Sequence, residues 1–85
     1  MEFKFPEIKT TRSEEEQAQK VIDEIEEFLS AKTEDHKDEE LIDVLHAVET
    51  LIRIRIKNGS KNLDDIIKFV IDKNTNRGYY KKECF

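Results

Sequence analysis

Apolar residues that recur at steps of three and four are the strongest structural signal in this chain. In the first run these residues are Ala18, Val21, Ile22, Ile25, Phe28 and Leu29. Such spacing places them on one face of an amphipathic α-helix. Ser13 and Glu16 have the spacing of a capping box, and aperiodic polar residues follow Ala31. We therefore expect a helix from about Ser13 to about Ala31.

Two further helices are predicted downstream. The second starts near residues 35–38 and carries Leu41, Val44, Leu45, Val48, Leu51 and Ile52. Residues 52–56 alternate isoleucine with arginine as a strand would, but they continue a helical run that stops at Asn58 and Gly59, a common helix C-terminal signal. We interpret them as helix. Asn62 can cap a short third helix with apolar residues from Leu63 to Ile71, and a turn-rich tail is expected after Lys73.

The predicted fold is all-α, a bundle of about three helices per chain completed by oligomerisation. With 85 residues, 36% of them apolar, the chain is marginal as an independent domain. Its single cysteine, Cys84, excludes an intramolecular disulfide. We expect an extended N-terminal arm at residues 1–12, a helical domain at 13–73 and a C-terminal tail at 74–85. A homodimer or homotetramer would cover the remaining apolar surface.

Charge is divided unevenly along the chain. Residues 13–49 contain 14 acidic against 3 basic side chains, whereas residues 50–85 contain 9 basic against 4 acidic ones. An acidic half repels phosphates, which argues against a nucleic-acid partner and favours cations. No run approaches the roughly 18 apolar residues of a membrane span, and no signal-peptide pattern opens the chain. We expect a cytoplasmic protein with no membrane partner.

Two pairs of acids lie three residues apart on the first two predicted helices. Glu24 and Glu27 form one pair, and Glu40 and Asp43 form the other. Residues three apart share a helix face, and both pairs fall on the same-handed flank of their apolar stripes. If the helices fold antiparallel, the pairs either converge or both point away. Converging carboxylates must take up protons or bind a cation, and an oxygen-only set suits Mg²⁺ or Mn²⁺. The alternative is an ordinary solvated acidic face.

These residues resemble a known motif. DEIEE at residues 23–27, followed by ELID at residues 40–43, is similar to the acidic double motif E-E-x-x-E and E-x-x-D of the all-α nucleotide pyrophosphatases. That superfamily includes MazG, the dimeric dUTPases and phosphoribosyl-ATP pyrophosphatase. KNTNRGYY at residues 73–80 resembles the K-N-x-x-R-G segment that often follows the third helix in MazG-like proteins. The resemblance covers about residues 14–80.

The resemblance implies a function. Glu24, Glu27, Glu40 and Asp43 would hold Mg²⁺ as the catalytic centre. A nucleoside triphosphate would be attacked by water at the α-phosphorus, giving the monophosphate and pyrophosphate, as in housekeeping of the nucleotide pool. Glu26, Glu39 or one of the ligands would accept the proton. The expected substrate-binding residues are Lys73 and Arg77 for the phosphates, Asn74 for the base or sugar, and Tyr79 or Tyr80 for stacking.

The rival interpretation is a non-enzymatic acidic helical module of the same fold that binds a basic protein partner. Among the remaining polar residues, His36 and His46 are expected to face solvent, since His46 lies off the apolar stripe. Arg53 and Arg55 are expected at an interface or in surface ion pairs.

Overall fold

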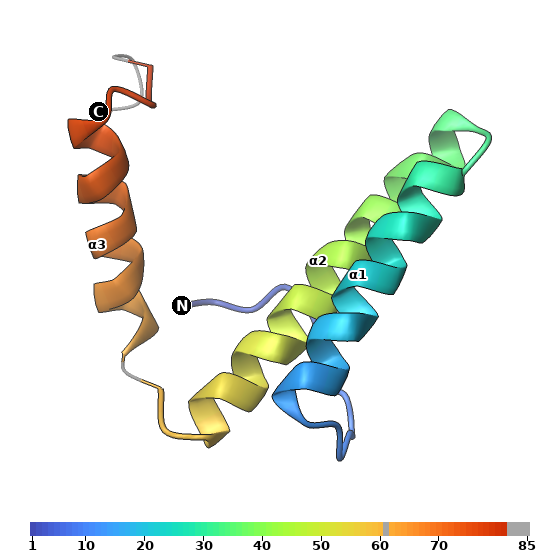
Figure 1. The fold of residues 1–85 in the computed structure, drawn as a ribbon, viewed down its shortest axis with the longest axis horizontal. Coiled ribbons are helices and arrows are strands. Elements are labelled where there is room, and N and C mark those ends of the chain that lie inside the picture. The colour runs from blue at the N-terminus through green and yellow to red at the C-terminus, as the bar shows by residue number, and fades with distance from the viewer. Residues whose placement is uncertain (61, 82–85) are drawn as a thin grey trace.

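The computed structural model describes residues 1–60 and 62–81, and these contain three helices and no strand. Helix α1 spans Glu14–Ser30, α2 spans Glu34–Lys57 and α3 spans Leu63–Asn76. The all-α prediction is confirmed, and the isoleucine–arginine alternation at 52–56 is helical. Figure 1 shows α1 and α2 side by side and antiparallel, with α3 standing apart.

The helix boundaries follow from local capping. At the start of α1 the Ser13 hydroxyl accepts from the Glu16 backbone N–H (3.1 Å), and the Glu16 carboxylate accepts from the Ser13 N–H (3.0 Å). Thr33 caps α2, which therefore begins slightly earlier than expected. Asn62 caps α3 as predicted, through a bond from the Asp64 N–H. The three-residue connection between α1 and α2 leaves room only for an antiparallel hairpin.

Helix α3 is longer than the sequence suggested. It continues to Asn76, so Lys73 and Asn74 lie in its last turns rather than in an irregular tail. Gly78 follows the C-cap residue Arg77, and its φ of +73° is a conformation that favours glycine. There the Tyr79 N–H donates to the Asn74 carbonyl, the long return bond that closes many helices.

The interface between α1 and α2 is small and unusually polar. Ala47 is the only buried apolar residue in the described part of the chain. Beside it Gln17 is 1% exposed, and its amide nitrogen donates to the Ala47 carbonyl at 3.0 Å. Because a buried amide needs its hydrogen bonds, this contact fixes how α1 lies on α2.

The N-terminal arm packs along α2. The buried carboxylate of Glu49 accepts the backbone N–H groups of Lys4 and Phe5 at 2.9 to 3.1 Å. The Phe5 ring stacks on His46 with 4.4 Å between centroids. Arg53 donates to the Phe5 carbonyl (2.9 Å) and lies over the Phe3 ring (4.0 Å). These contacts seat an irregular segment firmly on one flank of α2.

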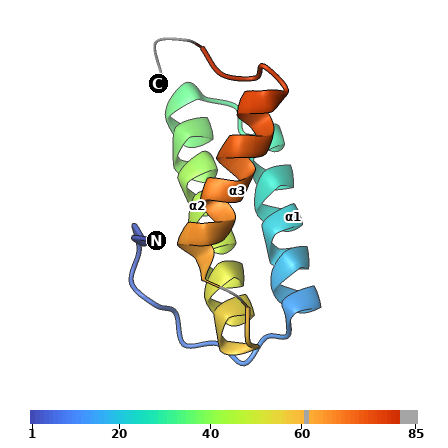
Figure 2. The same ribbon diagram turned by 90° about the vertical axis from the view of Figure 1, so that its left-hand side faces the viewer.

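Helix α3 packs against neither α1 nor α2 in the described chain. Figures 1 and 2 show it running beside the hairpin without closing on it. The radius of gyration is 15.3 Å, against about 12 Å for a compact domain of this length. No described helix is long and apolar enough to cross a membrane. Cys84 lies outside the described residues.

Candidate metal centre

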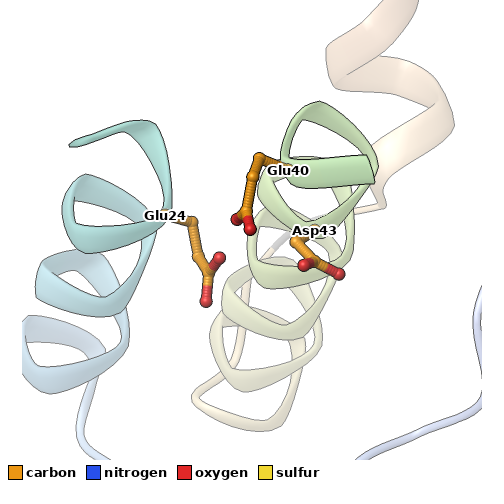
Figure 3. A group of neighbouring side chains, drawn as sticks. All are labelled: Glu24, Glu40 and Asp43. Atoms are coloured by element: carbon orange, nitrogen blue, oxygen red, sulfur yellow. The ribbon is translucent and has the colours of Figure 1, made fainter. Parts of the chain in front are cut away.

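Three of the predicted acids converge between α1 and α2. Glu24 projects from α1 toward α2, where it meets Glu40 and Asp43 (Figure 3). One carboxylate oxygen of each lies within 4.8 Å of the other two. Glu24 is 7% exposed, Glu40 is half-buried and Asp43 is exposed. Helix periodicity allowed the acid pairs either to converge or to point away from each other, and in the structure these three acids converge.

Glu27, the fourth predicted acid, lies at the edge of this cluster. It is exposed and does not join the three-oxygen group, but it neighbours Glu24 and Glu40. Hydrogen bonding to Glu24, with repulsion by the same carboxylate and by Glu40, raises the pKa of Glu27. Glu27 therefore gives up its proton less readily than an ordinary glutamate, because a further negative charge here is unfavourable.

Two side chains partly compensate the cluster. Lys20 pairs with Glu24 Oε1 at 2.8 Å and lowers the pKa of Glu24, while Glu24 raises the pKa of Lys20. His36 Nε2 lies 3.0 Å from Glu40 Oε1. The prediction that His36 is exposed is confirmed. Lys20 and His36 each lie four residues before the acid that they contact, on the same helix.

The second oxygens of the same two acids are left over. Glu24 Oε2 and Glu40 Oε2 are both buried, and neither has a hydrogen-bond partner among the described residues. Buried polar atoms are almost always paired, so two unpaired carboxylate oxygens on neighbouring helices require an explanation. A hard divalent cation fits the donor set, because it prefers oxygen ligands and needs no histidine or cysteine.

The predicted substrate-binding residues do not join the cluster within one chain. Lys73 and Asn74 lie in the last turns of α3, and Arg77, Tyr79 and Tyr80 follow it. Figure 1 shows this end of α3 well away from the hairpin. Four of the five form two pairs, since Asn74 hydrogen-bonds the Tyr80 hydroxyl (3.3 Å) and Arg77 lies 6.0 Å from the centroid of the Tyr79 ring.

The sequence interpretation missed several residues beside the carboxylates. The prediction that His46 faces solvent was wrong: it is half-buried under Phe5, and its Nε2 is buried without a partner among the described residues. Helix periodicity put it off the apolar stripe, but the arm covers that flank. Lys20 could have been found from its four-residue spacing to Glu24, which favours an ion pair on a helix.

No protein-family model, curated protein or solved structure matches this chain.

Proposed function

We propose that this chain is a Mg²⁺-dependent nucleoside triphosphate pyrophosphohydrolase of the MazG type. The observation that supports the proposal best is the pair of unpartnered, buried oxygens of Glu24 and Glu40, with Asp43 beside them. Their positions match the acidic motif on residues 23–27 and 40–43. Glu24, Glu40 and Asp43 are the proposed ligands, and Glu27 joins them on losing its proton. Mn²⁺ suits the same donors.

The proposed chemistry divides between ion and chain. Bound Mg²⁺ supplies charge neutralisation at the phosphoryl oxygens and a lower pKa for a coordinated water. The carboxylates hold the ion at the seam of α1 and α2, where Gln17 and the capping box keep α1 fixed. A carboxylate such as Glu26, Glu39 or Glu27 takes the proton from the attacking water.

A second copy of the chain is part of the proposal. The accessible surface is 6982 Å², whereas a folded monomer of 10.1 kDa exposes roughly 5300 Å². The surplus exceeds 1000 Å², the scale of a specific interface. Much of the exposed surface is apolar, including Leu29 on α1, Leu41 on α2 and Phe69 on α3. Association as a homodimer, or as a tetramer of dimers, covers it.

The dimer also gives a place to the residues at the end of α3. Lys73, Asn74, Arg77, Tyr79 and Tyr80 cannot serve the carboxylates of their own chain in this arrangement. In the proposed assembly they face the carboxylates of the other copy and hold the phosphates and base of the substrate. Arginine there is suited to bidentate phosphate contacts.

The direct test is a panel of canonical and modified nucleoside triphosphates incubated with the protein and Mg²⁺. Release of pyrophosphate together with the monophosphate is expected from at least one of them. Glu40→Gln should remove that activity, whereas Asp38→Asn, which changes the net charge by the same amount at an exposed position of α2 outside the three-oxygen group, should leave most of it. A panel that yields no pyrophosphate contradicts the catalytic proposal.

The second candidate is the non-enzymatic module. The ion pair of Glu24 with Lys20 favours it, because the cluster then already has an internal counter-charge. On that interpretation the acidic hairpin binds a basic protein segment. Calorimetry with Mn²⁺ separates the two functions: the enzyme needs metal binding that Glu24→Gln abolishes, and the module does not.

A further inference from the structure

A cavity opens directly beside the carboxylate cluster, between the arm and the α1–α2 hairpin. Its volume is about 180 Å³, where a single water needs only about 10–15 Å³ on the same measure. Glu24 and Asp43 form the wall that it shares with the proposed metal centre. The other walls include Arg12, Lys20 and His46. Side chains that can donate hydrogen bonds thus line the same open space as the two carboxylates.

Arg12 is held at this cavity by a part-buried contact. Its guanidinium donates to the side-chain oxygen Oε1 of Gln17 at 3.1 Å, and the side-chain nitrogen of Gln17 donates to the Ala47 backbone carbonyl. Gln17 is 1% exposed, so its orientation is determined by the interior of the hairpin. A guanidinium has five N–H donors, and Gln17 uses one of them. The remaining donors stay available along the cavity.

Lys20 brings a second positive charge to the same space. Glu24 raises the pKa of Lys20, whereas the positive charge of Arg12 acts in the opposite direction. Two cationic side chains that line one cavity favour an anion there. In the structure Glu24 Oε1 forms an ion pair with Lys20 Nζ at 2.8 Å. A cation on the carboxylates would compete for that oxygen and release the ammonium group.

The third donor is His46. His46 lines the cavity and its ring is fixed by stacking on Phe5, while its Nε2 is buried without a partner among the described residues. When it carries the ring proton, this nitrogen can donate one hydrogen bond. Each of the three donors is therefore positioned by a different element: the arm, α1 and α2.

We propose that the cavity between Arg12, Lys20 and His46 is an anion site that binds a phosphate group of the substrate. The inference rests on the proposed function, because the metal must first neutralise Glu24 and Asp43 for an anion to enter. Lys20 then exchanges partners, leaving Glu24 for the phosphate. This makes metal binding and phosphate binding mutually dependent within a single chain, before any residue from α3 takes part.

The test is titration of the whole protein with inorganic tripolyphosphate premixed with Mg²⁺. Arg12→Gln and Lys20→Gln should each weaken binding about tenfold or more, since both remove a charged donor. The matched controls are Arg55→Gln and Lys37→Gln, which remove the same charges away from the cavity and should change affinity by less than about twofold. Lys20→Arg should retain binding.

Mn²⁺ titration without phosphate supplies the second measurement. Lys20→Gln should bind Mn²⁺ more tightly than the wild type, because it removes the competing ammonium group from Glu24. The inference is overturned if Mn²⁺ binds normally while Arg12→Gln and Lys20→Gln bind tripolyphosphate as the wild type does. Equal losses in the control variants overturn it as well. A wild type that binds no Mn²⁺ rejects the proposed function and the anion site together.

Discussion

Glu24 differs from an ordinary helix glutamate in the burial and the partners of its two carboxylate oxygens. One is paired with Lys20 and the other is buried without a partner among the described residues. If that second oxygen is a metal ligand, then Glu24→Gln and Asp43→Asn should each weaken Mn²⁺ binding by more than about 100-fold. Loss of an outer partner alone commonly costs 10–100-fold. The affinity can be measured from the spectrum of free Mn²⁺ during titration.

The matched control for this experiment is Glu26→Gln. Glu26 is exposed on the same turn of α1 and lies outside the three-oxygen group, but the substitution changes net charge by the same amount. It should alter Mn²⁺ affinity by no more than about twofold, because exposed charges act weakly at a distance. If Glu24→Gln and Glu26→Gln lose equal Mn²⁺ affinity, the ion is attracted by the overall negative charge and is not bound at a specific site.

Glu27 makes the stability of the metal-free protein depend on pH. Its pKa in the folded protein is raised above 4.5, first by Glu24 and then by Glu40. The folded state therefore holds the proton more tightly, and its stabilising effect is complete below 4.5 and lost as pH rises through the folded value. Glu27→Gln should raise the metal-free melting temperature at pH 7, with the gain shrinking toward pH 4.5 and below.

Thermal melts followed by circular dichroism across this pH range check the prediction. Glu26→Gln again serves as the control, and its gain at pH 7 should be smaller than that of Glu27→Gln. Added Mg²⁺ should remove the advantage of Glu27→Gln, because the ion neutralises the repulsion that raised the pKa. A gain that is the same at every pH would be at odds with repulsion by Glu24 as its cause.

At the scale of elements, the arm depends on one buried acid. Glu49 is 3% exposed and accepts the backbone N–H groups of Lys4 and Phe5. Glu49→Ala leaves both donors unpaired and should lower the free energy of unfolding by about 2–4 kcal/mol. Denaturant unfolding measures the loss, and hydrogen exchange at Lys4 and Phe5 should become fast. Glu49→Gln keeps an acceptor and should lose about half as much.

Helices and their ends could be predicted from the sequence because they depend on neighbours along the chain. Ser13 with Glu16, Asn58 with Gly59, and Asn62 are local signals, and each stands where the structure places a helix end. The short hairpin connection makes an antiparallel pair of helices predictable, but the sequence left open whether Glu24 and residues 40–43 converge or point away from each other. The burial of His46 could not be predicted, since it depends on an arm without periodicity that crosses α2.

The place of α3 was also beyond sequence reasoning, for a different physical reason. Its stripe from Leu63 to Ile71 predicts a buried face, but the pattern does not say which surface covers it. In the structure no residue of α3 is buried, and apolar side chains of this helix, among them Phe69 and Ile71, are exposed. A helix of 14 residues is marginal by itself in water. We therefore expect packing against a second copy of the chain to stabilise it.

For the whole molecule this predicts assembly through α3. The wild type should elute as a dimer or tetramer in size-exclusion chromatography with light scattering at micromolar concentration. Ile67→Asp should shift it toward monomer and reduce its helicity, because a charge buried at an apolar interface is strongly unfavourable. Lys68→Asp, on the next residue of the same helix, introduces the same aspartate on the exposed polar side and should leave assembly intact. A wild type that is monomeric under these conditions contradicts the prediction.

Assembly and folding should then be coupled. If α3 is ordered only against a second copy, the melting temperature must rise with protein concentration, because dissociation and unfolding share one equilibrium. A dilution series followed by circular dichroism at 222 nm should show this slope for the wild type and a flat response for Ile67→Asp. The hairpin of α1 and α2 keeps its own contacts through Gln17 and Ala47. Helicity should therefore fall in two steps on dilution and heating, with α3 lost first.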